Sequence, residues 1–147
     1  MNEKYAGLCM SETARKLLLN NASQWDANCN GVGSEDGTWW QRLIYHLTPN
    51  TIWGMDITPA SDIHDNEYTV PQSFLTKVQA ENHRFQADIN FKTNIDLLTD
   101  RAYMASWMPR CIREFLREAR KTRAHTYYMI LRKQGEESFM ANKKIGK

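Results

Sequence analysis

The sequence predicts a mainly α-helical protein, and two observations support this fold class. Apolar residues recur at helical spacing in the segments 11–21, 73–98 and 110–134. Helix start and stop signals bound these segments, with Ser11 as a candidate N-cap and Gly135 as a candidate C-terminal stop. We therefore expect several amphipathic helices joined by polar loops.

Length and composition favour one globular domain covering residues 1–147, because a chain of 147 residues can build a single sizeable core. The longest apolar runs, such as residues 127–131, fall far short of the roughly 20 residues that span a bilayer. The first residues carry an early acid, Glu3, and no apolar stretch, so they do not resemble an export signal. An odd number of cysteines, Cys9, Cys29 and Cys111, fits reduced thiols better than a disulfide framework. Together these features predict a cytoplasmic protein.

The first half of the chain is expected to contain two helices separated by a loop. Residues 11–21 form a helix with Ala14, Leu17 and Leu18 facing inward. Residues 22–49 are rich in Gly and short polar residues and contain a Trp pair, so we expect a long and functional loop. The next helix begins with Thr58 as N-cap and ends before Pro71.

Residues 73–98 predict a longer helix with one polar residue on its inner stripe. That stripe runs through Phe74, Val78, Asn82, Phe85 and Ile89. Because Asn82 interrupts an apolar face, it could offer a hydrogen bond to a side chain on the preceding helix.

Residues 110–121 and 122–134 predict two further helical segments in series. We expect Cys111, Ile112, Phe115, Leu116 and Ala119 to face inward. Basic residues, Arg120 among them, are expected to cover the outside together with Glu114 and Glu118. Ion pairs on a solvated face explain most of this pattern, while an anionic membrane surface or nucleic acid is an alternative partner. The modest net charge of +2 places nucleic acid last.

The segment 58–68 carries the candidate site. On a helix, Ser61, His64, Asp65 and Tyr68 follow the i, i+3, i+4, i+7 spacing that normally marks a buried stripe, yet all four are polar. A half-buried imidazole beside a carboxylate is costly unless partners, a metal or a substrate compensate for the lost water. The stripe therefore indicates either a functional site or an interior histidine with satisfied hydrogen bonds.

The order His64-Asp65-x-x-Tyr68, after the loop Asn30-Gly31-Val32-Gly33, resembles the catalytic helix of the phospholipase A2 superfamily, in particular its bacterial and fungal branch. Residues 51–58 and 123–128 extend this resemblance to small phospholipase-A2-like proteins encoded in phages and prophages. The resemblance implies a helical domain in which the His-Asp helix packs against a second long helix and a Gly-rich loop. For a phage-encoded chain it also implies the host cytoplasm.

The resemblance further implies Ca²⁺-dependent hydrolysis of phospholipid sn-2 esters. His64 would be the general base that takes a proton from the attacking water, a role suited to an imidazole. Asp65 would bind Ca²⁺ together with backbone carbonyls of the loop at Gly31 and Gly33, and a hard cation prefers such oxygen ligands. Tyr68 would hydrogen-bond the partner of the histidine.

Three departures from the family pattern leave an alternative open. Val32 and Ser61 stand where the family often has cysteines, and Asn82 aligns with the aspartate that orients the histidine. An amide could accept the Nδ1 hydrogen bond of His64 without stabilising an imidazolium, which predicts slower chemistry, although Glu81 or Asp88 could substitute in another helical register. The alternative is a catalytically degenerate phage-type protein that binds or inhibits a protein target, or contacts nucleic acid.

Overall fold

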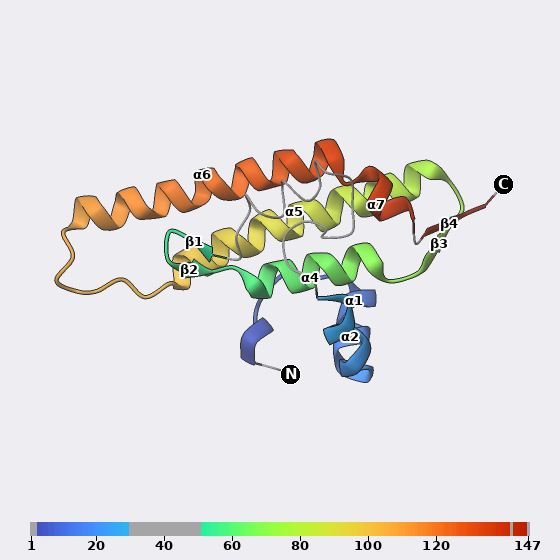
Figure 1. Cartoon of the computed structure of the whole chain (residues 1–147), viewed down its shortest axis with the longest axis horizontal. Helices are drawn as coiled ribbons and strands as arrows, with labels where there is room; N and C mark the ends of the chain where they lie inside the picture. The colour runs from blue at the N-terminus through green and yellow to red at the C-terminus, as the bar shows by residue number, and fades with distance from the viewer. Residues whose placement is uncertain (1–2, 30–50, 142, 147) are drawn as a thin grey trace.

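The computed structural model describes residues 3–29, 51–141 and 143–146, and this part of the chain is mainly α-helical, as expected. The two longest helices, α5 and α6, run side by side, and α4 packs against α5 (Figure 1). On its other side α4 contacts α1 and α2. The elements in chain order are the 3-10 helix η1 (Glu3–Tyr5), α1 (Glu12–Asn20), α2 (Ala22–Asn28), β1 (Thr51–Ile52), β2 (Met55–Asp56), α4 (Thr58–Thr69), β3 (Gln72–Phe74), α5 (Lys77–Arg101), α6 (Arg110–Gln134), α7 (Glu136–Met140) and β4 (Lys143–Ile145).

The first helix forms as expected, but residues 22–28 are helical where a loop over residues 22–49 was predicted, and residues 30–49 of that predicted loop lie outside the described residues. Ser11 caps α1, because its hydroxyl accepts a hydrogen bond from the amide of Ala14 at 3.2 Å. Asn21 is both the C-cap of α1 and the N-cap of α2. Its side chain accepts a hydrogen bond from the amide of Gln24 at 3.2 Å. Trp25 on α2 is only 1% exposed, and the burial of this large side chain stabilises α2. The short polar residues around Trp25 are the reason that the sequence analysis predicted a loop here.

Helix α4 lies between the N-terminal helices and α5, and it is buried on most of its circumference. Pro59 lies in its first turn and Val70 is its C-cap, which confirms the expected end before Pro71. The expected capping role of Thr58 is wrong, because Ile57 occupies the N-cap position, and the Ile57 side chain makes no capping hydrogen bond. Thr58 donates instead from its amide to the carboxylate of Asp56 at 2.8 Å.

Helix α5 presents a different face to the core from the one predicted. Val78 is 68% exposed, Asn82 is exposed and Phe74 lies outside the helix, on β3. The residues that α5 buries are Ala80, Arg84, Ala87, Asp88, Asn90, Phe91, Asn94, Ile95 and Thr99. Small alanines and polar residues with partners occupy this face, so counting apolar residues alone selected the opposite one.

Helix α6 is one continuous helix that ends at Gly135, as the sequence indicated, but its first half is more exposed than predicted. Cys111 is exposed and Phe115 is 59% exposed, whereas Arg120, expected outside, is only 5% exposed. The ion pair of Lys121 with Asp100 places the start of the α5–α6 contact near residue 120. Residues 110–119 therefore extend beyond the end of α5 (Figure 1).

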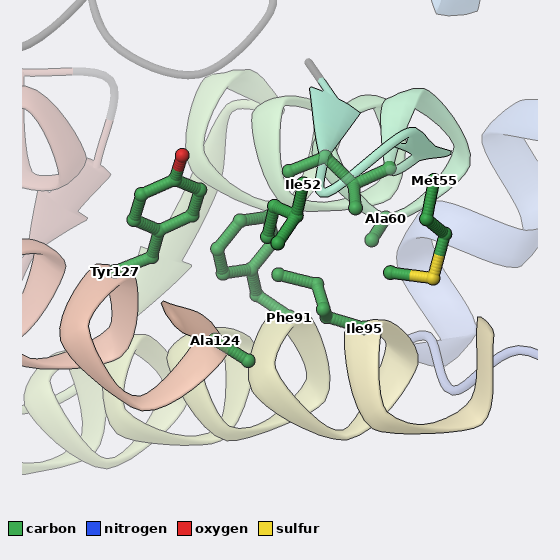
Figure 2. Packing of buried hydrophobic residues seen from close by; sticks show 8 residues of the cluster. Ile52, Met55, Ala60, Phe91, Ile95, Ala124 and Tyr127 are labelled. Carbon is green, nitrogen blue, oxygen red and sulfur yellow. The ribbon is translucent and has the colours of Figure 1, made fainter. Parts of the chain in front are cut away.

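A hydrophobic cluster holds α4, α5, α6 and the β1–β2 hairpin together. Phe91 and Ile95 of α5 meet Ala124 and Tyr127 of α6 under Ile52 of the hairpin (Figure 2). The hairpin pairs Thr51–Ile52 antiparallel with Met55–Asp56, and β3 pairs with β4 in parallel. Across the described ranges, each helix is too short or too polar to cross a bilayer.

Candidate functional site

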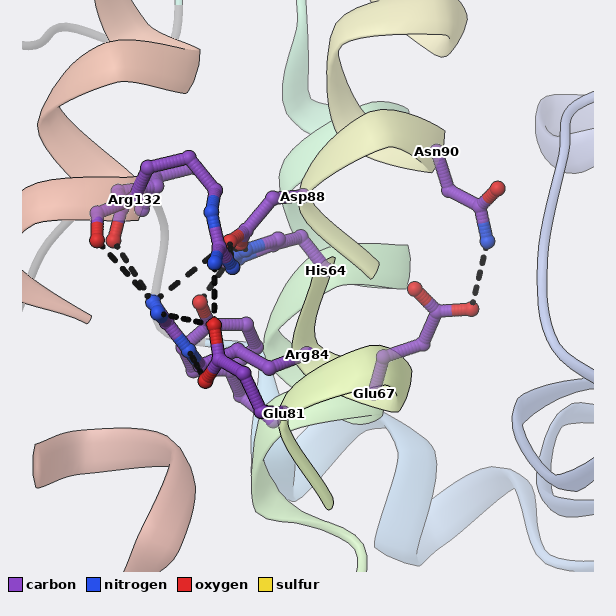
Figure 3. A network of polar contacts seen from close by, with 9 residues as sticks. His64, Glu67, Glu81, Arg84, Asp88, Asn90 and Arg132 are labelled. Carbon is purple, nitrogen blue, oxygen red and sulfur yellow. Dashed lines mark hydrogen bonds and ion pairs between the residues drawn. The ribbon is translucent and has the colours of Figure 1, made fainter. Parts of the chain in front are cut away.

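The candidate site centres on His64, which α4 holds against α5. His64 is 6% exposed, and its Nε2 lies 3.1 Å from Oδ1 of Asp88 (Figure 3). Its ring is 4.2 Å from the Tyr68 ring and 5.1 Å from the Phe91 ring, measured between centroids. Because Nε2 is held by the carboxylate, Nδ1 is the ring nitrogen left to exchange a proton with a substrate or water.

Asp88 is fully buried and accepts hydrogen bonds on both carboxylate oxygens. Tyr68 donates its hydroxyl to Oδ1 at 2.6 Å, the same oxygen that His64 contacts. Arg132 of α6 donates to Oδ2 at 2.8 Å. Burial alone would raise the pKa of Asp88, but hydrogen bonds and charge from His64, Tyr68 and Arg132 outweigh it and lower that pKa. Asp88 therefore stays ionised beside the imidazole.

A second carboxylate, Glu81, extends this centre to a network between α5 and α6. Arg84 donates from Nε and Nη2 to Glu81 at 2.8 Å each, and Arg132 also pairs with Glu81. Arg84 Nη1 lies 3.8 Å from Oδ2 of Asp88 and donates to the backbone carbonyl of Arg132 at 3.3 Å. Two arginines thus fix the position of Asp88, which in turn fixes the ring of His64 (Figure 3).

The expected partner of His64, Asn82, is wrong. Asn82 is exposed on α5, and the histidine contacts Asp88 through Nε2 instead of contacting an amide through Nδ1. The cause is the rotated face of α5, which turns Asp88 toward α4 and Asn82 toward solvent. Helix α5 is therefore rotated so that Asp88, and not Asn82, is the hydrogen-bond partner of His64. Asp88 supplies the negative charge that Asn82 would have lacked.

The polar stripe of α4 is buried as predicted. Ser61 and Tyr68 are 1% and 7% exposed, and Asp65 is half-buried. Burial and the charge of Asp88 both raise the pKa of Tyr68, so Tyr68 stays a neutral donor. The Ser61 hydroxyl is buried and has no hydrogen-bond partner among the described residues, and it lies in the position where the resemblance would place a cysteine.

The expected Ca²⁺ ligands are only partly within the described residues, because Gly31 and Gly33 lie outside them. Asp65 lies near Cys29, since burial and then the charges of Asp62 and Asp65 raise the pKa of that thiol to about 12. Within the described ranges, no three His, Cys, Asp or Glu residues cluster as a metal site.

Sequence reasoning missed three further buried polar residues on α4. Asp62 accepts from Lys4 at 2.6 Å and from the Tyr5 hydroxyl at 2.8 Å, which holds the N-terminal segment against α4. Asn66 donates to the Asp62 carbonyl at 2.8 Å. Glu67 is 2% exposed and accepts from the amide of Ser11 at 2.5 Å. The signal was the uninterrupted polarity of residues 64–67, which indicates a helix buried on several sides by hydrogen-bonded partners.

Comparison of the chain with protein-family models, with curated proteins and with solved structures finds no match. The interpretation of the site therefore depends on its geometry and on the chemistry of its residues.

Proposed function

We propose that the chain hydrolyses the sn-2 ester of phospholipids in a Ca²⁺-dependent reaction with His64 as general base. The observation that carries the proposal is the buried Asp88, which accepts from both His64 and Tyr68. A general base works best when a second group fixes its tautomer and stabilises its protonated form. Asp88 supplies both, and it does so from the long helix on which the resemblance places the orienting aspartate.

In this mechanism each residue has a separate role. Nε2 of His64 stays hydrogen-bonded to Asp88, while Nδ1 takes the proton of the attacking water. Tyr68 holds the carboxylate oxygen that faces the imidazole, and Arg132 holds the other. Asp65, with backbone carbonyls at Gly31 and Gly33, would hold Ca²⁺. The cation would stabilise the negative charge that develops on the ester carbonyl oxygen.

The test compares the wild type with His64→Ala on phospholipid vesicles with Ca²⁺. Loss of a general base typically lowers the rate about 10²- to 10⁴-fold, so hydrolysis should fall by that factor. Asn82→Asp is the matched control, because Asn82 is exposed on the same helix as Asp88, and its rate should equal that of the wild type. Circular dichroism confirms that each variant is folded. Equal hydrolysis by wild type and His64→Ala would remove His64 from the mechanism.

A second candidate is a catalytically degenerate protein on the same scaffold that binds a protein target. The observation that favours it is the ion network of Glu81, Arg84, Asp88 and Arg132, which joins α5 to α6 and gives Asp88 a purely structural use. One result distinguishes the two candidate functions. Under the second, the purified chain is folded and shows no ester hydrolysis when Ca²⁺ is present.

A further inference from the structure

One end of the molecule carries most of the aromatic side chains that the described residues expose to solvent. This aromatic end comprises the turn at residues 53–54, the connection 102–109 between α5 and α6, and residues 110–119 of α6, which extend beyond α5 (Figure 1). Its exposed aromatic residues are Trp53, Tyr103, Trp107 and Phe115, each between 58% and 87% exposed. Elsewhere in the described ranges Phe85 is exposed, but the guanidinium of Arg132 lies over its ring.

The apolar surface of the aromatic end is continuous from the hairpin turn to α6. The Trp53 ring meets Phe115 edge-on, with 6.2 Å between centroids. Ile112, one helical turn before Phe115, is 45% exposed. A mostly apolar groove of about 640 Å³ lies between the hairpin and α6, and its charged lining residues are Glu118 and Arg123. The groove therefore adds apolar area without net charge, and exposed apolar surface of this kind marks a contact site for a protein or a membrane.

Positive charge is concentrated in the same part of the chain. Residues 100–123 contain seven Lys or Arg and three Asp or Glu, so their net charge is +4, whereas the rest of the chain has a net charge of −2. Two of the three acids are already paired, Asp100 with Lys121 at 3.4 Å and Glu114 with Arg110 at 2.6 Å. An anionic surface would therefore attract the aromatic end and repel the remainder, which orients the whole molecule.

We propose that the aromatic end docks on the surface of an anionic lipid bilayer. Tyr103 and Trp107 have the amphipathic rings that favour the boundary between head groups and acyl chains. Phe115 would insert its ring just below the head groups, and the arginines of α6 would contact lipid phosphates. Exposed apolar side chains beside arginines on one helix are typical of a segment that lies in this boundary.

A bilayer fits this surface better than a second copy of the chain does. A symmetric dimer through the aromatic end would bring two regions of like positive charge together, which is unfavourable. A nucleic acid would match the charge, but it offers no alkyl environment for Ile112 and Phe115.

The aromatic end is separate from the His64 centre, so the proposal does not depend on the proposed hydrolysis. His64 contacts α5 at Asp88 and Phe91, and α5 continues to Arg101. The end of α5 is therefore about 15 Å further along the helix axis than Phe91. If the chain does hydrolyse phospholipids, docking by the aromatic end would keep it at the surface that contains its substrate.

Co-sedimentation of the full chain with vesicles of ether-linked lipids tests the docking. These lipids have no ester, so binding is measured without hydrolysis, and a chelator removes Ca²⁺. The wild type should bind ether-linked phosphatidylglycerol at least about tenfold more tightly than ether-linked phosphatidylcholine. Its binding to the anionic vesicles should weaken as the salt concentration rises, because salt screens the attraction.

Two pairs of variants locate the contact. Trp107→Ala should weaken binding about tenfold or more, whereas Leu75→Ala, at a similarly exposed apolar residue near the other end of α5, should bind as the wild type does. Arg117→Gln should weaken binding about fivefold, whereas Arg15→Gln, at an exposed arginine of α1, should stay within about twofold of the wild type. All four side chains are exposed, so each variant should fold, and circular dichroism checks this.

The proposal is overturned if the wild type does not bind the anionic vesicles, if it binds neutral vesicles equally well, or if Trp107→Ala and Arg117→Gln both bind as the wild type does. Sedimentation velocity without lipid tests the other occupant, and a dimer that Trp107→Ala dissociates would assign the aromatic end to a second copy instead. Failure of the proposed function gives a different result, because the chain would then bind these vesicles and still leave ester phospholipids intact.

Discussion

Asp88→Asn should strongly destabilise the protein, because Asp88 is the fully buried acceptor on which three helices converge. An asparagine has one acceptor oxygen, so it can serve either the His64 and Tyr68 side or Arg132, but not both. Whichever group is not served by that oxygen, His64 with Tyr68 or Arg132, then faces the amide NH₂ and loses the negative charge of Asp88. Breaking a buried pair by removing one partner costs about 3–5 kcal/mol. Arg132 is 21% exposed and keeps Glu81, so the low end, about 3 kcal/mol, is expected.

Urea and thermal unfolding of wild type, Asp88→Asn and Asn82→Asp measure this effect. A loss of about 3 kcal/mol corresponds to about 6–12 °C in melting temperature for a domain of this size. Asn82→Asp, on the exposed face of α5, should stay within about 0.5 kcal/mol of wild type. A loss below about 1 kcal/mol in Asp88→Asn would refute the network as drawn in Figure 3.

The pH dependence of this difference has a definite sign. The folded state lowers the pKa of Asp88, so its stabilisation is present above the unfolded pKa of about 4 and is lost as pH falls through the folded value. The gap between wild type and Asp88→Asn should therefore shrink at acidic pH. A gap that is constant from neutral pH to strong acid would contradict an ionised Asp88.

Three further perturbations test neighbouring parts of the structure. Tyr68→Phe removes the 2.6 Å bond to the Asp88 carboxylate and should cost about 1.5–3 kcal/mol in urea unfolding, with slower vesicle hydrolysis; an unchanged free energy of unfolding would discount the bond. Burial lowers the pKa of Lys143 to about 8 from 10.5, so the unfolded chain binds more protons between these values and the free energy of unfolding should rise with pH across that window. Lys143→Met should remove this rise, and a rise that persists would assign it to another group. Ca²⁺ should raise the melting temperature of wild type and not of Asp65→Asn, and equal shifts in the two would place the cation elsewhere.

The helices of this protein could be predicted from sequence where their ends carry clear signals. Ser11 caps α1, Val70 ends α4 ahead of Pro71, and Gly135 ends α6. These signals are local, because each depends on backbone groups within one turn.

Helix faces were harder to predict, because they depend on tertiary partners. α5 buries Arg84 and Asp88, which become acceptable in the core only through Glu81 and Arg132, and Arg132 is 44 residues away from Asp88 in sequence. A count of apolar residues selected the face with Val78 instead. Long-range hydrogen bonds of this kind leave no periodic signal in a single sequence.

The polar stripe of α4 is buried as its spacing predicted, but the sequence analysis gave His64 the wrong hydrogen-bond partner. His64 and Tyr68 are buried side by side, as their i, i+4 spacing predicted. Asp88 and Asn82 are six residues apart on α5, so the choice between them depended on the helix's rotation. The burial of Arg120 could not be predicted, because an arginine among the other charges of α6 resembles part of a solvated face.

The most direct test of the central claim is positional analysis of phospholipid hydrolysis. Vesicles of a phospholipid with different isotopic labels on its sn-1 and sn-2 fatty acids are incubated with the purified chain, with Ca²⁺ or with a chelator, and the released acids are identified by mass spectrometry. If His64, held by Asp88, is the general base of a Ca²⁺-dependent reaction, the sn-2 acid alone is released, and only with Ca²⁺. Release of neither acid, or of the sn-1 acid, would contradict the proposed function.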